Sequence, residues 1–565
     1  MKHLKWYILL AGCLYSGASL FAQGSSWHSP VEIPCLLSGS FGEPRPNHFH
    51  CGIDVKTQGV VNKRILAVGD GYVSRMTVGK NGFGNALYVT HPNGLVSVYC
   101  HLNDFVPALH QLLRQQQYKE QNDEVDVRLQ PGVFPVKAGM WIAYSGNTGA
   151  SLAPHLHLEF QKPLGGDMFD LVDPLPYFTH LIKDDMPPRI HGIKLYASSG
   201  KGIIDGSGKS VSFSPGKDGR VVCNAWGRIG AAVWADDYMN GTGNKFGVYC
   251  IILNVDGHTV FKSELDQFRF DENPMVNAWG DYAHFRKTRH WYLKSFLEPG
   301  NKLDFITVGS NQGWIDINEE RLYHFEYILE DLKGNRTVIR FAVLGKQDEM
   351  ALRKEEEKER ARRNSPDFLV ANQTHVVQRP GMELRIPNGA LANDERLEIE
   401  MTAKPDCVSN TYRFSDDEIP LLKRATLMIS PKKATGDLSK YYIASSKGYV
   451  GNQYDKGWLV AQIRDLTETY EIMQDTVPPV VAPVGAWIGR NAAILKVKVT
   501  DKHTGVKRFK ANVDGAFILF VRDDNVWTCR LKESPLKKEG KMRALTIEVE
   551  DRCGNKEVYR QKFIY

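Results

Sequence analysis

Apolar and polar residues alternate along many short stretches of this chain. In 495–500 and again in 545–550, every second residue is apolar. Alternation with a period of two is typical of a strand that turns one face to a core and the other to solvent. Glycine, proline and asparagine separate these stretches, so the pattern predicts a mainly β protein built from antiparallel sheets.

The clearest hairpin signal lies near the N-terminus. An Asn-Gly pair at 93–94 joins the stretches 86–90 and 96–102, and this pair favours a tight turn between two strands. The hairpin is expected to place His101 near the end of its second strand, on the same face as Tyr99.

Two segments have helical patterns instead. After residue 107, leucines recur at helical spacing up to residue 118, which predicts a helical insertion packed on the first domain; a lid over a substrate groove is the alternative. The run 346–363 places acidic and basic residues at i,i+4 spacing, for example Glu359 and Arg363. It predicts a solvated helix that acts as a spacer.

A weak internal repeat surrounds this second helix. Three motifs occur twice in the same order, a Pro-Pro entrance, an Asp-Gly turn and a Gly-Asn turn. They occupy 184–188 and 475–479, 254–257 and 512–515, and 331–335 and 551–555. The repeat predicts two β-sandwiches of immunoglobulin-like type, the first with extra loops.

These signals predict several domains in series. The expected organisation is a signal peptide at 1–22, a first domain at 23–180, a sandwich at 184–345, a charged helical linker at 346–365, a β-rich domain at 366–474 and a C-terminal sandwich at 475–565. The chemistry is expected in the first domain, because the others show no catalytic constellation.

Polar residues that can bind a metal interrupt the apolar pattern of the first domain. His50 and Asp54 lie four residues apart, and His155 and His157 are followed by Glu159. In an extended chain, residues an even number apart share a face, so each strand carries these groups on one side. Two imidazoles and one carboxylate form a ligand set that suits Zn²⁺ and leaves a fourth position for water.

Neighbouring residues have simpler interpretations. Alternation directs Cys51 and Cys100 to the opposite face, so both are expected to be buried structural cysteines. His48 is interpreted as a flanking polar residue, and Tyr99 as lining the groove, with a core position as its alternative. Glu159 shares the ligand face and either orients a histidine or is solvated.

Composition and charge narrow the class of protein. The chain has 565 residues, 42% of them hydrophobic and 24% charged, which is ordinary for a multidomain globular protein. Its formal net charge of +6 is small and comes without a concentrated basic face, so no nucleic-acid partner is expected. The eight cysteines that follow Cys13 are too dispersed to form a disulfide scaffold.

The N-terminus predicts export to the periplasm or cell envelope. Lys2 and Lys5 precede an apolar run at 6–14, and small residues follow up to residue 23, as in a secretory signal peptide. The stretch 10–13 resembles a lipobox, but cleavage there would leave a very short apolar segment, so lipid anchoring is the less favoured alternative. No later stretch approaches the ~20 apolar residues that span a bilayer, so no integral membrane insertion is expected.

Several motifs carry a family resemblance. They are Phe41-Gly42-Glu43-Pro44-Arg45 with His50-Cys51-Gly52-Ile53-Asp54, then Gly84-Asn85, Tyr99-Cys100-His101-Leu102, Ser145-Gly146-Asn147-Thr148-Gly149 and Pro154-His155-Leu156-His157. In this order they closely resemble the M23 family of zinc metallopeptidases, the lysostaphin and LytM type, over roughly the first third of the mature chain. The resemblance implies an antiparallel-sheet catalytic domain, zinc ligands at His50, Asp54 and His157, and a catalytic pair of His101 and His155.

The resemblance also implies a substrate, peptide bonds in peptidoglycan. The leading hypothesis is an exported zinc endopeptidase that cuts peptide cross-links, with the β domains positioning it at the envelope. The alternatives are an inactive scaffold that regulates another wall hydrolase, and a peptidase that acts on an envelope protein bound by the β domains. No His-Glu-x-x-His motif is present, so a glutamate-based mechanism is excluded, and the choice of base between His101 and His155 stays open.

Overall fold

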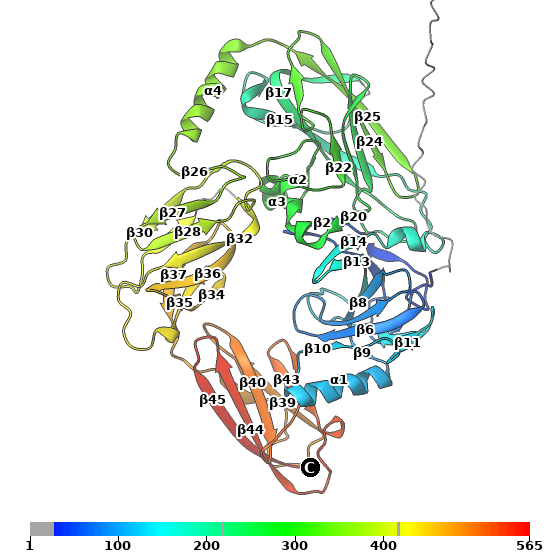
Figure 1. Cartoon of the computed structure of the whole chain (residues 1–565), viewed down its shortest axis with the longest axis vertical. Coiled ribbons are helices and arrows are strands. Elements are labelled where there is room, and N and C mark those ends of the chain that lie inside the picture. The colour runs from blue at the N-terminus through cyan, green and yellow to red at the C-terminus, as the bar shows by residue number, and fades with distance from the viewer. Residues whose placement is uncertain (1–26, 217–218, 415–418) are drawn as a thin grey trace, which may run out of the picture.

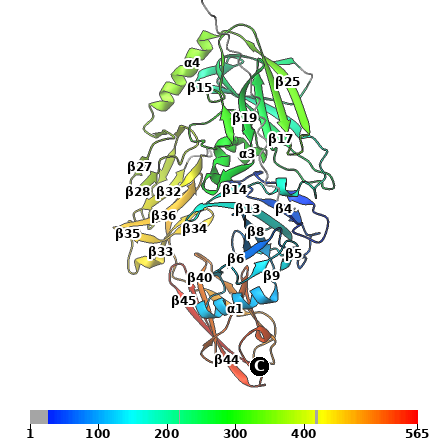
Figure 2. The same ribbon diagram turned by 45° about the vertical axis from the view of Figure 1, so that its right-hand side comes forward.

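The computed structural model describes residues 27–216, 219–414 and 419–565, and most of this part of the chain forms antiparallel β-sheets. Four units follow one another in a closed loop, so that the C-terminal unit returns to the N-terminal one (Figures 1 and 2). The prediction of a mainly β protein is confirmed. The expected signal peptide at 1–22 lies outside the described residues.

A twisted sheet forms the N-terminal unit. Its main strand order is β1 (Leu37–Gly39), β4 (Ile53–Lys56), β13 (His155–Gly165), β8 (Val96–Leu102), β7 (Asn85–Thr90), β6 (Gly71–Val78) and β10 (Val125–Arg128). The strands β7 and β8 form the hairpin expected from the Asn-Gly turn. One face of the sheet packs on an apolar core that includes Ile53, Leu158 and Phe160, all fully buried.

Smaller elements complete this unit. A three-stranded sheet of β5 (Arg64–Leu66), β12 (Trp141–Tyr144) and β9 (Asp104–Phe105) lies beside the main sheet, and β2 (Pro44–Arg45) forms a short hairpin with β3 (His48–Phe49). The helix α1 (Pro107–Glu120) is the helical insertion expected from the leucine spacing, and it buries Leu109 and Leu113. These contacts fit the packed insertion that the sequence favoured.

The second unit wraps a ten-stranded sheet around its own core. The strand order is β16 (Val211–Phe213), β15 (Arg189–Ile204), β17 (Arg220–Asp236), β25 (Arg336–Gly345), β24 (Leu322–Glu330), β18 (Cys250–Val255), β19 (His258–Glu264) and β22 (Ile306–Val308). All these pairings are antiparallel except β17 with β25. The short strand β20 (Gln267–Arg269) pairs with β14 (Met168–Val172), so the second unit extends the sheet of the first.

Two helices of the second unit also approach the first. They are α2 (Val276–Trp279) and α3 (Tyr282–Thr288), and the Trp279 ring of α2 lies 6.0 Å from the ring of Phe49 in β3. Phe49 directly precedes His50. The second unit therefore braces the hairpin from which a predicted ligand projects.

The helix α4 (Glu349–Arg363) leads to the third unit. None of its residues is buried, and it lies along β15, where a Cβ on Gly200 would meet the Glu359 side chain. The third unit has two five-stranded sheets, β27 (His375–Arg379), β28 (Met382–Ile386), β32 (Pro420–Ile429), β36 (Trp458–Asp465) and β35 (Gln453–Asp455), against β30 (Ile399–Thr402), β31 (Thr411–Phe414), β37 (Thr469–Gln474), β33 (Tyr441–Ser445) and β34 (Gly448–Gly451).

The C-terminal unit is a smaller sandwich. Its sheets are β38 (Val480–Pro483), β39 (Ile494–Thr500), β43 (Val526–Arg530) and β42 (Val521–Asp523), against β41 (Ala516–Phe517), β40 (Val506–Val513), β44 (Met542–Asp551) and β45 (Lys556–Ile564). It closes the loop by contacting α1: Arg114 lies 3.5 Å from Glu533, and the rings of Tyr118 and Phe517 are 5.7 Å apart.

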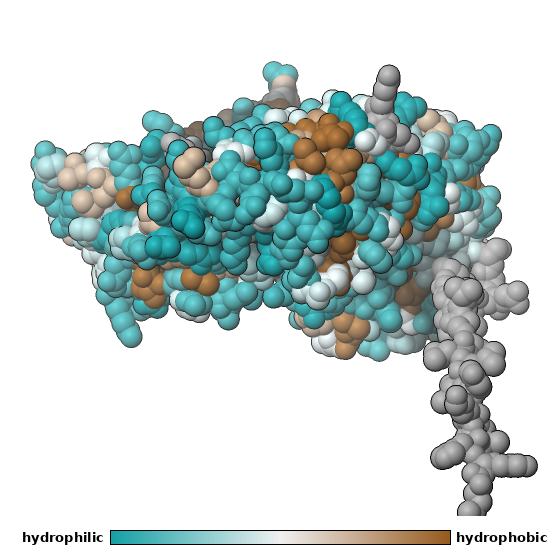
Figure 3. Space-filling view, turned by 90° about the horizontal axis from the view of Figure 1, so that it is seen from above, coloured by the Kyte–Doolittle hydropathy of each residue, from teal (hydrophilic) through white to brown (hydrophobic). Residues whose placement is uncertain are grey.

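The surface of the described residues is mixed in character. Seen from above, it is mostly hydrophilic with separate small hydrophobic patches (Figure 3), as on an ordinary protein surface. Within the described ranges, no helix has both the length and the apolar character needed to cross a membrane.

Candidate metal centre

Strand register brings two of the predicted ligands together. In the pairing of β4 with β13, Asp54 lies directly opposite His157, and opposite residues of antiparallel strands share a face. The atoms Asp54 Oδ1 and His157 Nδ1 are 2.9 Å apart. The polar face of the sheet therefore begins the site without any contribution from loops.

His50 joins this pair from a turn, not from the same strand as Asp54. The strand β3 ends at Phe49 and β4 begins at Ile53, so the expected continuous strand is interrupted between the two residues. Gly52 makes the close approach possible, because a Cβ there would lie 2.2 Å from the carbonyl oxygen of Leu158. His50 Nε2 consequently lies 3.0 Å from Asp54 Oδ1 and 2.9 Å from His157 Nδ1.

The outer nitrogens of both imidazoles are already bound. His50 Nδ1 donates to the carbonyl oxygen of Ser40 at 2.6 Å, and His157 Nε2 donates to Glu159 Oε1 at 3.0 Å. In the neutral tautomers that these bonds select, lone pairs on His50 Nε2 and His157 Nδ1 face the carboxylate of Asp54. Three acceptors turned toward one another require a cation or a proton between them.

The three donor atoms fit a metal ion. Their separations of 2.9 to 3.0 Å are a few tenths of an ångström below the ~3.3 Å between tetrahedral ligands at the Zn–N distance. Arg45 donates to the other oxygen of Asp54, Oδ2, at 2.8 Å, which leaves Oδ1 as the single oxygen directed at the site. Two nitrogens and one oxygen are the borderline set that zinc favours.

Burial and charge set the protonation of this cluster. Burial lowers the pKa of His50 to about 4, despite the opposing effect of Asp54. Burial also acts to lower the pKa of His157, but its hydrogen bonds to Asp54 and Glu159 outweigh this and raise the pKa to about 9. For Asp54, the effect of burial is outweighed by His50 and the histidine hydrogen bonds, and the pKa lies far below its usual range. Without a metal, the cluster therefore holds a proton at His157.

His101 and His155 stand beside the three donors, each fixed through its outer nitrogen. His101 Nδ1 donates to the carbonyl oxygen of Thr148, and His155 Nδ1 donates to that of Ala153, both at 2.8 Å. Their Nε2 atoms are left with lone pairs, and His155 Nε2 lies 3.4 Å from Asp54 Oδ1. The two rings are 4.9 Å apart. Burial lowers the pKa of His101 to about 4, so its imidazole is neutral at pH 7.

The expected face of His101 is wrong, because the strand β8 contains a bulge. Asn85 pairs with Leu102 but Leu87 pairs with Tyr99, so β8 has one extra residue there, and His101 has a φ of 59°. A bulge with a left-handed residue turns one side chain out of the alternation. His101 thereby leaves the face of Tyr99 and reaches the site.

The same bulge corrects two other expectations. Cys100, not Tyr99, pairs with His157 and lies on the face of the site, where it is fully buried with Ala86 and Val98. Tyr99 lies in the opposite core, fully buried, and its hydroxyl accepts from the backbone N–H of Val68 at 2.8 Å. Tyr99 thus has the core position that was its alternative.

The three other polar residues near the site, Glu159, His48 and Cys51, have different surroundings. Glu159 is 1% exposed and bound to His157, so it orients this histidine and is not solvated. His48 is exposed, and its Nδ1 contacts the carbonyl oxygen of Pro46, away from the three donors. The thiol of Cys51 is close to Asn273 of the second unit, with 3.0 Å between Sγ and Nδ2.

Sequence reasoning missed four supports of the site. Arg45 belongs to the family motif at 41–45, but nothing in the spacing of the residues showed that it would bind Asp54. Ser40 and Thr148 act through backbone carbonyl oxygens, which no residue type reveals. Phe83 stacks near His157, with ring centres 6.2 Å apart, and its only signal was the glycine-rich turn around it.

Comparisons with known proteins agree with this site. The family model described as Peptidase family M23 matches residues 48–119, which include His50, Asp54 and His101, and a Zu5-like domain model matches residues 366–475. No curated protein matches the chain in sequence.

Among solved structures, the chain is similar to the catalytic domain of the antimicrobial peptidase lysostaphin from Staphylococcus simulans, with 21% identity, a TM-score of 0.20 and coverage of 26% of this chain and 92% of that chain. It is also similar to the catalytic domain of a prophage-encoded M23 protein from Enterococcus faecalis, with 23% identity, a TM-score of 0.18 and coverage of 25% and 90%. A zinc-containing peptidase from Vibrio cholerae has 23% identity, a TM-score of 0.18 and coverage of 24% and 36%. The family model thus identifies a domain of peptidase family M23 within the N-terminal unit of this chain, over residues 48–119.

Proposed function

We propose that this protein is an exported zinc endopeptidase that hydrolyses peptide cross-links in peptidoglycan. The observation that carries the proposal is the buried set of three acceptors, His50 Nε2, Asp54 Oδ1 and His157 Nδ1, with two further imidazole lone pairs beside it. Such a set is costly to bury unless a proton or a metal cation neutralises it, and the convergence of all three acceptors on one point favours a metal that displaces the proton of His157.

The residues around the metal site supply the rest of the chemistry. Zinc held there would lower the pKa of a coordinated water toward ~7 and polarise the scissile carbonyl group. Asp54 is limited to one coordinating oxygen by Arg45, and Glu159 fixes the ring of His157 and increases its basicity. These contacts hold the ligand geometry before substrate arrives.

His101 and His155 are placed for proton transfer. Both present Nε2 to the site and keep Nδ1 bound to a backbone carbonyl oxygen, so neither ring can rotate freely. One neutral imidazole can accept a proton from the attacking water and return it to the leaving amine. The other, in the imidazolium form that also carries a proton on Nε2, can donate to the carbonyl oxygen and stabilise the negative charge that develops there.

The location of the protein and the exposure of the site bear on how the enzyme would meet its substrate. The signal peptide expected from the sequence supports export, and the β units would position the enzyme at the periplasmic or cell-envelope face of the wall. The side chain of His155 is 17% exposed, more than the 8–9% of His157 and Asp54, so a substrate is expected to enter from its side.

Digestion of purified sacculi tests the proposal. The zinc-loaded mature protein should release new muropeptides, as measured by mass spectrometry. His101→Ala and His155→Ala should retain zinc but lose release, and His258→Ala, at an exposed histidine of β19, should match the wild type. A zinc-loaded wild type that releases no muropeptide would contradict the proposal. Binding to sacculi without cleavage would favour a scaffold, and cleavage of an envelope protein would favour the other alternative.

A further inference from the structure

A second cluster of acidic groups lies at the junction of the first two units. Asp184, Asp237 and Asp331 each offer a carboxylate oxygen, and these three oxygens lie within 4.8 Å of one another. Asp184 precedes β15, Asp237 directly follows β17, and Asp331 lies in the turn from β24 to β25. The fold thus gathers three separate loops at the end of the second unit that faces the peptidase domain.

One of these carboxylates is buried and has an oxygen without a hydrogen-bond partner. Asp237 is 3% exposed, and its Oδ1 has no hydrogen-bond partner. The ammonium group of Lys333, which lines the same cavity, forms no ion pair with Asp237 and donates to the carbonyl oxygen of Thr179 at 2.7 Å. A buried, unpaired carboxylate oxygen among other carboxylates is unfavourable unless a cation or a proton binds it, and in the absence of a cation burial raises the pKa of Asp237 to about 8.

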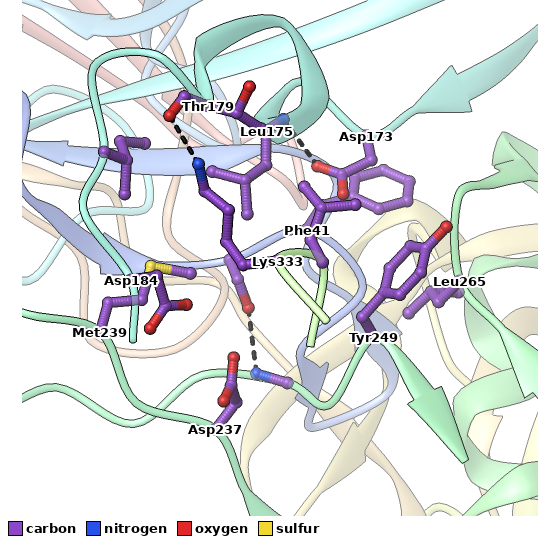
Figure 4. Close-up of a pocket in the computed structure, with 14 residues that line it drawn as sticks. Phe41, Asp173, Leu175, Thr179, Asp184, Asp237, Met239, Tyr249, Leu265 and Lys333 are labelled. Atoms are coloured by element: carbon purple, nitrogen blue, oxygen red, sulfur yellow. Dashed lines mark hydrogen bonds between the residues drawn. The ribbon is translucent and has the colours of Figure 1, made fainter. Parts of the chain in front are cut away.

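The other two carboxylates are held in place by the backbone. Asp331 accepts from the N–H groups of Lys333 and Asn335, at 2.8 and 2.9 Å, and Asp184 accepts from that of Met186 at 3.2 Å. Figure 4 shows Asp184 and Asp237 on one side of a small cavity, beside Met239. The positions are fixed by the fold, so the cluster does not depend on mobile side chains.

We propose that Asp184, Asp237 and Asp331 form a calcium-binding site in the second unit, at its junction with the peptidase domain. Three carboxylates are hard oxygen donors, and oxygens on opposite sides of a calcium ion lie ~4.8 Å apart at the usual Ca–O distance. The adjoining cavity of about 30 Å³ has room for water, which would complete the coordination.

The site would fasten a loop that supports the zinc centre. The segment 237–247 starts at Asp237 and ends at Gly247, whose N–H donates to Ser40 Oγ at 3.0 Å. The carbonyl oxygen of Ser40 accepts from His50 Nδ1. Calcium would thus hold the loop against the strand edge that positions a zinc ligand, although the proposal does not depend on which substrate the peptidase cuts.

The internal repeat supplies a comparison. Asp475, Asp501 and Asp551 occupy the corresponding places, before β38, after β39 and at the turn from β44 to β45, and their oxygens also lie within 4.8 Å of one another. In that cluster Thr504 donates to Asp475, and three backbone N–H groups donate to Asp501. Because Asp501, which corresponds to Asp237, has protein partners whereas Asp237 Oδ1 has none, the proposal concerns the first cluster alone.

Equilibrium dialysis with ⁴⁵Ca²⁺ tests the site in the full-length, zinc-loaded protein. Wild type should bind one more calcium ion per chain than Asp237→Asn, and any ion at the C-terminal cluster cancels in this difference. The matched control is Asp185→Asn, which removes a neighbouring exposed charge that pairs with Lys183 and Asn240. It should bind as the wild type does. Equal calcium binding by wild type and Asp237→Asn would overturn the proposal.

Thermal unfolding gives a second readout that reports on folding. Calcium should raise the melting temperature of wild type and of Asp185→Asn. The rise should be smaller for Asp237→Asn, because this variant lacks the proposed site. In calcium-free buffer Asp237→Asn should be at least as stable as wild type, because an amide replaces a buried, unpaired carboxylate. If the rise is the same in all three proteins, the site does not bind calcium.

Discussion

Glu159 offers the sharpest test of how the metal site is built. Glu159→Gln keeps the shape of a side chain that is 1% exposed and keeps an oxygen that can accept from His157 Nε2. It removes the negative charge that makes the imidazole a stronger ligand. Its new amide nitrogen would also face Gln161 Nε2, which now donates to Glu159 Oε2 at 3.0 Å.

The expected loss follows from this position behind a ligand. Changes to such supporting groups typically weaken metal affinity 10- to 100-fold, which corresponds to about 1.4 to 2.8 kcal/mol. Competition with a chromophoric zinc chelator measures the dissociation constant directly. The matched control is Glu32→Gln, which removes the charge of a half-exposed glutamate paired with Arg64, far from the histidines in sequence.

The reasoning would be refuted by a Glu159→Gln protein that is folded and binds zinc as tightly as wild type and Glu32→Gln do. That result would mean that Glu159 does not act through His157. Loss of folding would be visible by circular dichroism before the zinc titration.

Five further outcomes are expected. Tyr99→Phe should destabilise the protein by about 1 to 3 kcal/mol in urea unfolding, because the buried N–H of Val68 loses its acceptor. The zinc content should stay unchanged, and a loss of zinc would show that Tyr99 contributes to the metal site. Because the pKa of metal-free His157 is raised to about 9, zinc binding at pH 7 should release about one proton, seen as buffer-dependent heats in calorimetry, and zinc affinity should rise with pH up to about 9. The same proton on His157 affects the stability of the metal-free protein. It stabilises the metal-free fold fully below pH ~6.5, and this contribution is lost as the pH rises through about 9. A metal-free protein that becomes more stable over this pH range would contradict the prediction. His48→Ala should leave zinc binding unchanged, and Phe517→Ala should loosen the contact with Tyr118 and increase the radius of gyration in X-ray scattering.

The sequence predicted the β architecture well because period-two alternation and turn residues are local signals. The hairpin around the Asn-Gly pair and the helix after residue 107 both follow from a few residues each. The pairing of β20 with β14 joins residues almost a hundred positions apart, and no local pattern encodes it.

The site shows where strand parity is sufficient and where it fails. Parity correctly grouped His155 with His157, which lie on one uninterrupted strand. It misplaced His101 and Cys100, because one extra residue in β8 reverses the alternation, and a left-handed residue at His101 was not visible in the sequence. The order of motifs pointed to residues that lie close together in the structure, even where parity gave the wrong reason for their proximity.

The central claim is that His50, Asp54 and His157 hold one zinc ion. Anomalous diffraction at the zinc edge, from crystals of the zinc-loaded protein, tests this most directly. The account predicts one strong peak at ~2.0 to 2.2 Å from His50 Nε2, Asp54 Oδ1 and His157 Nδ1, with the Nε2 atoms of His101 and His155 directed toward it. A peak bound by other residues, or no peak at these three atoms in zinc-loaded crystals, would contradict it.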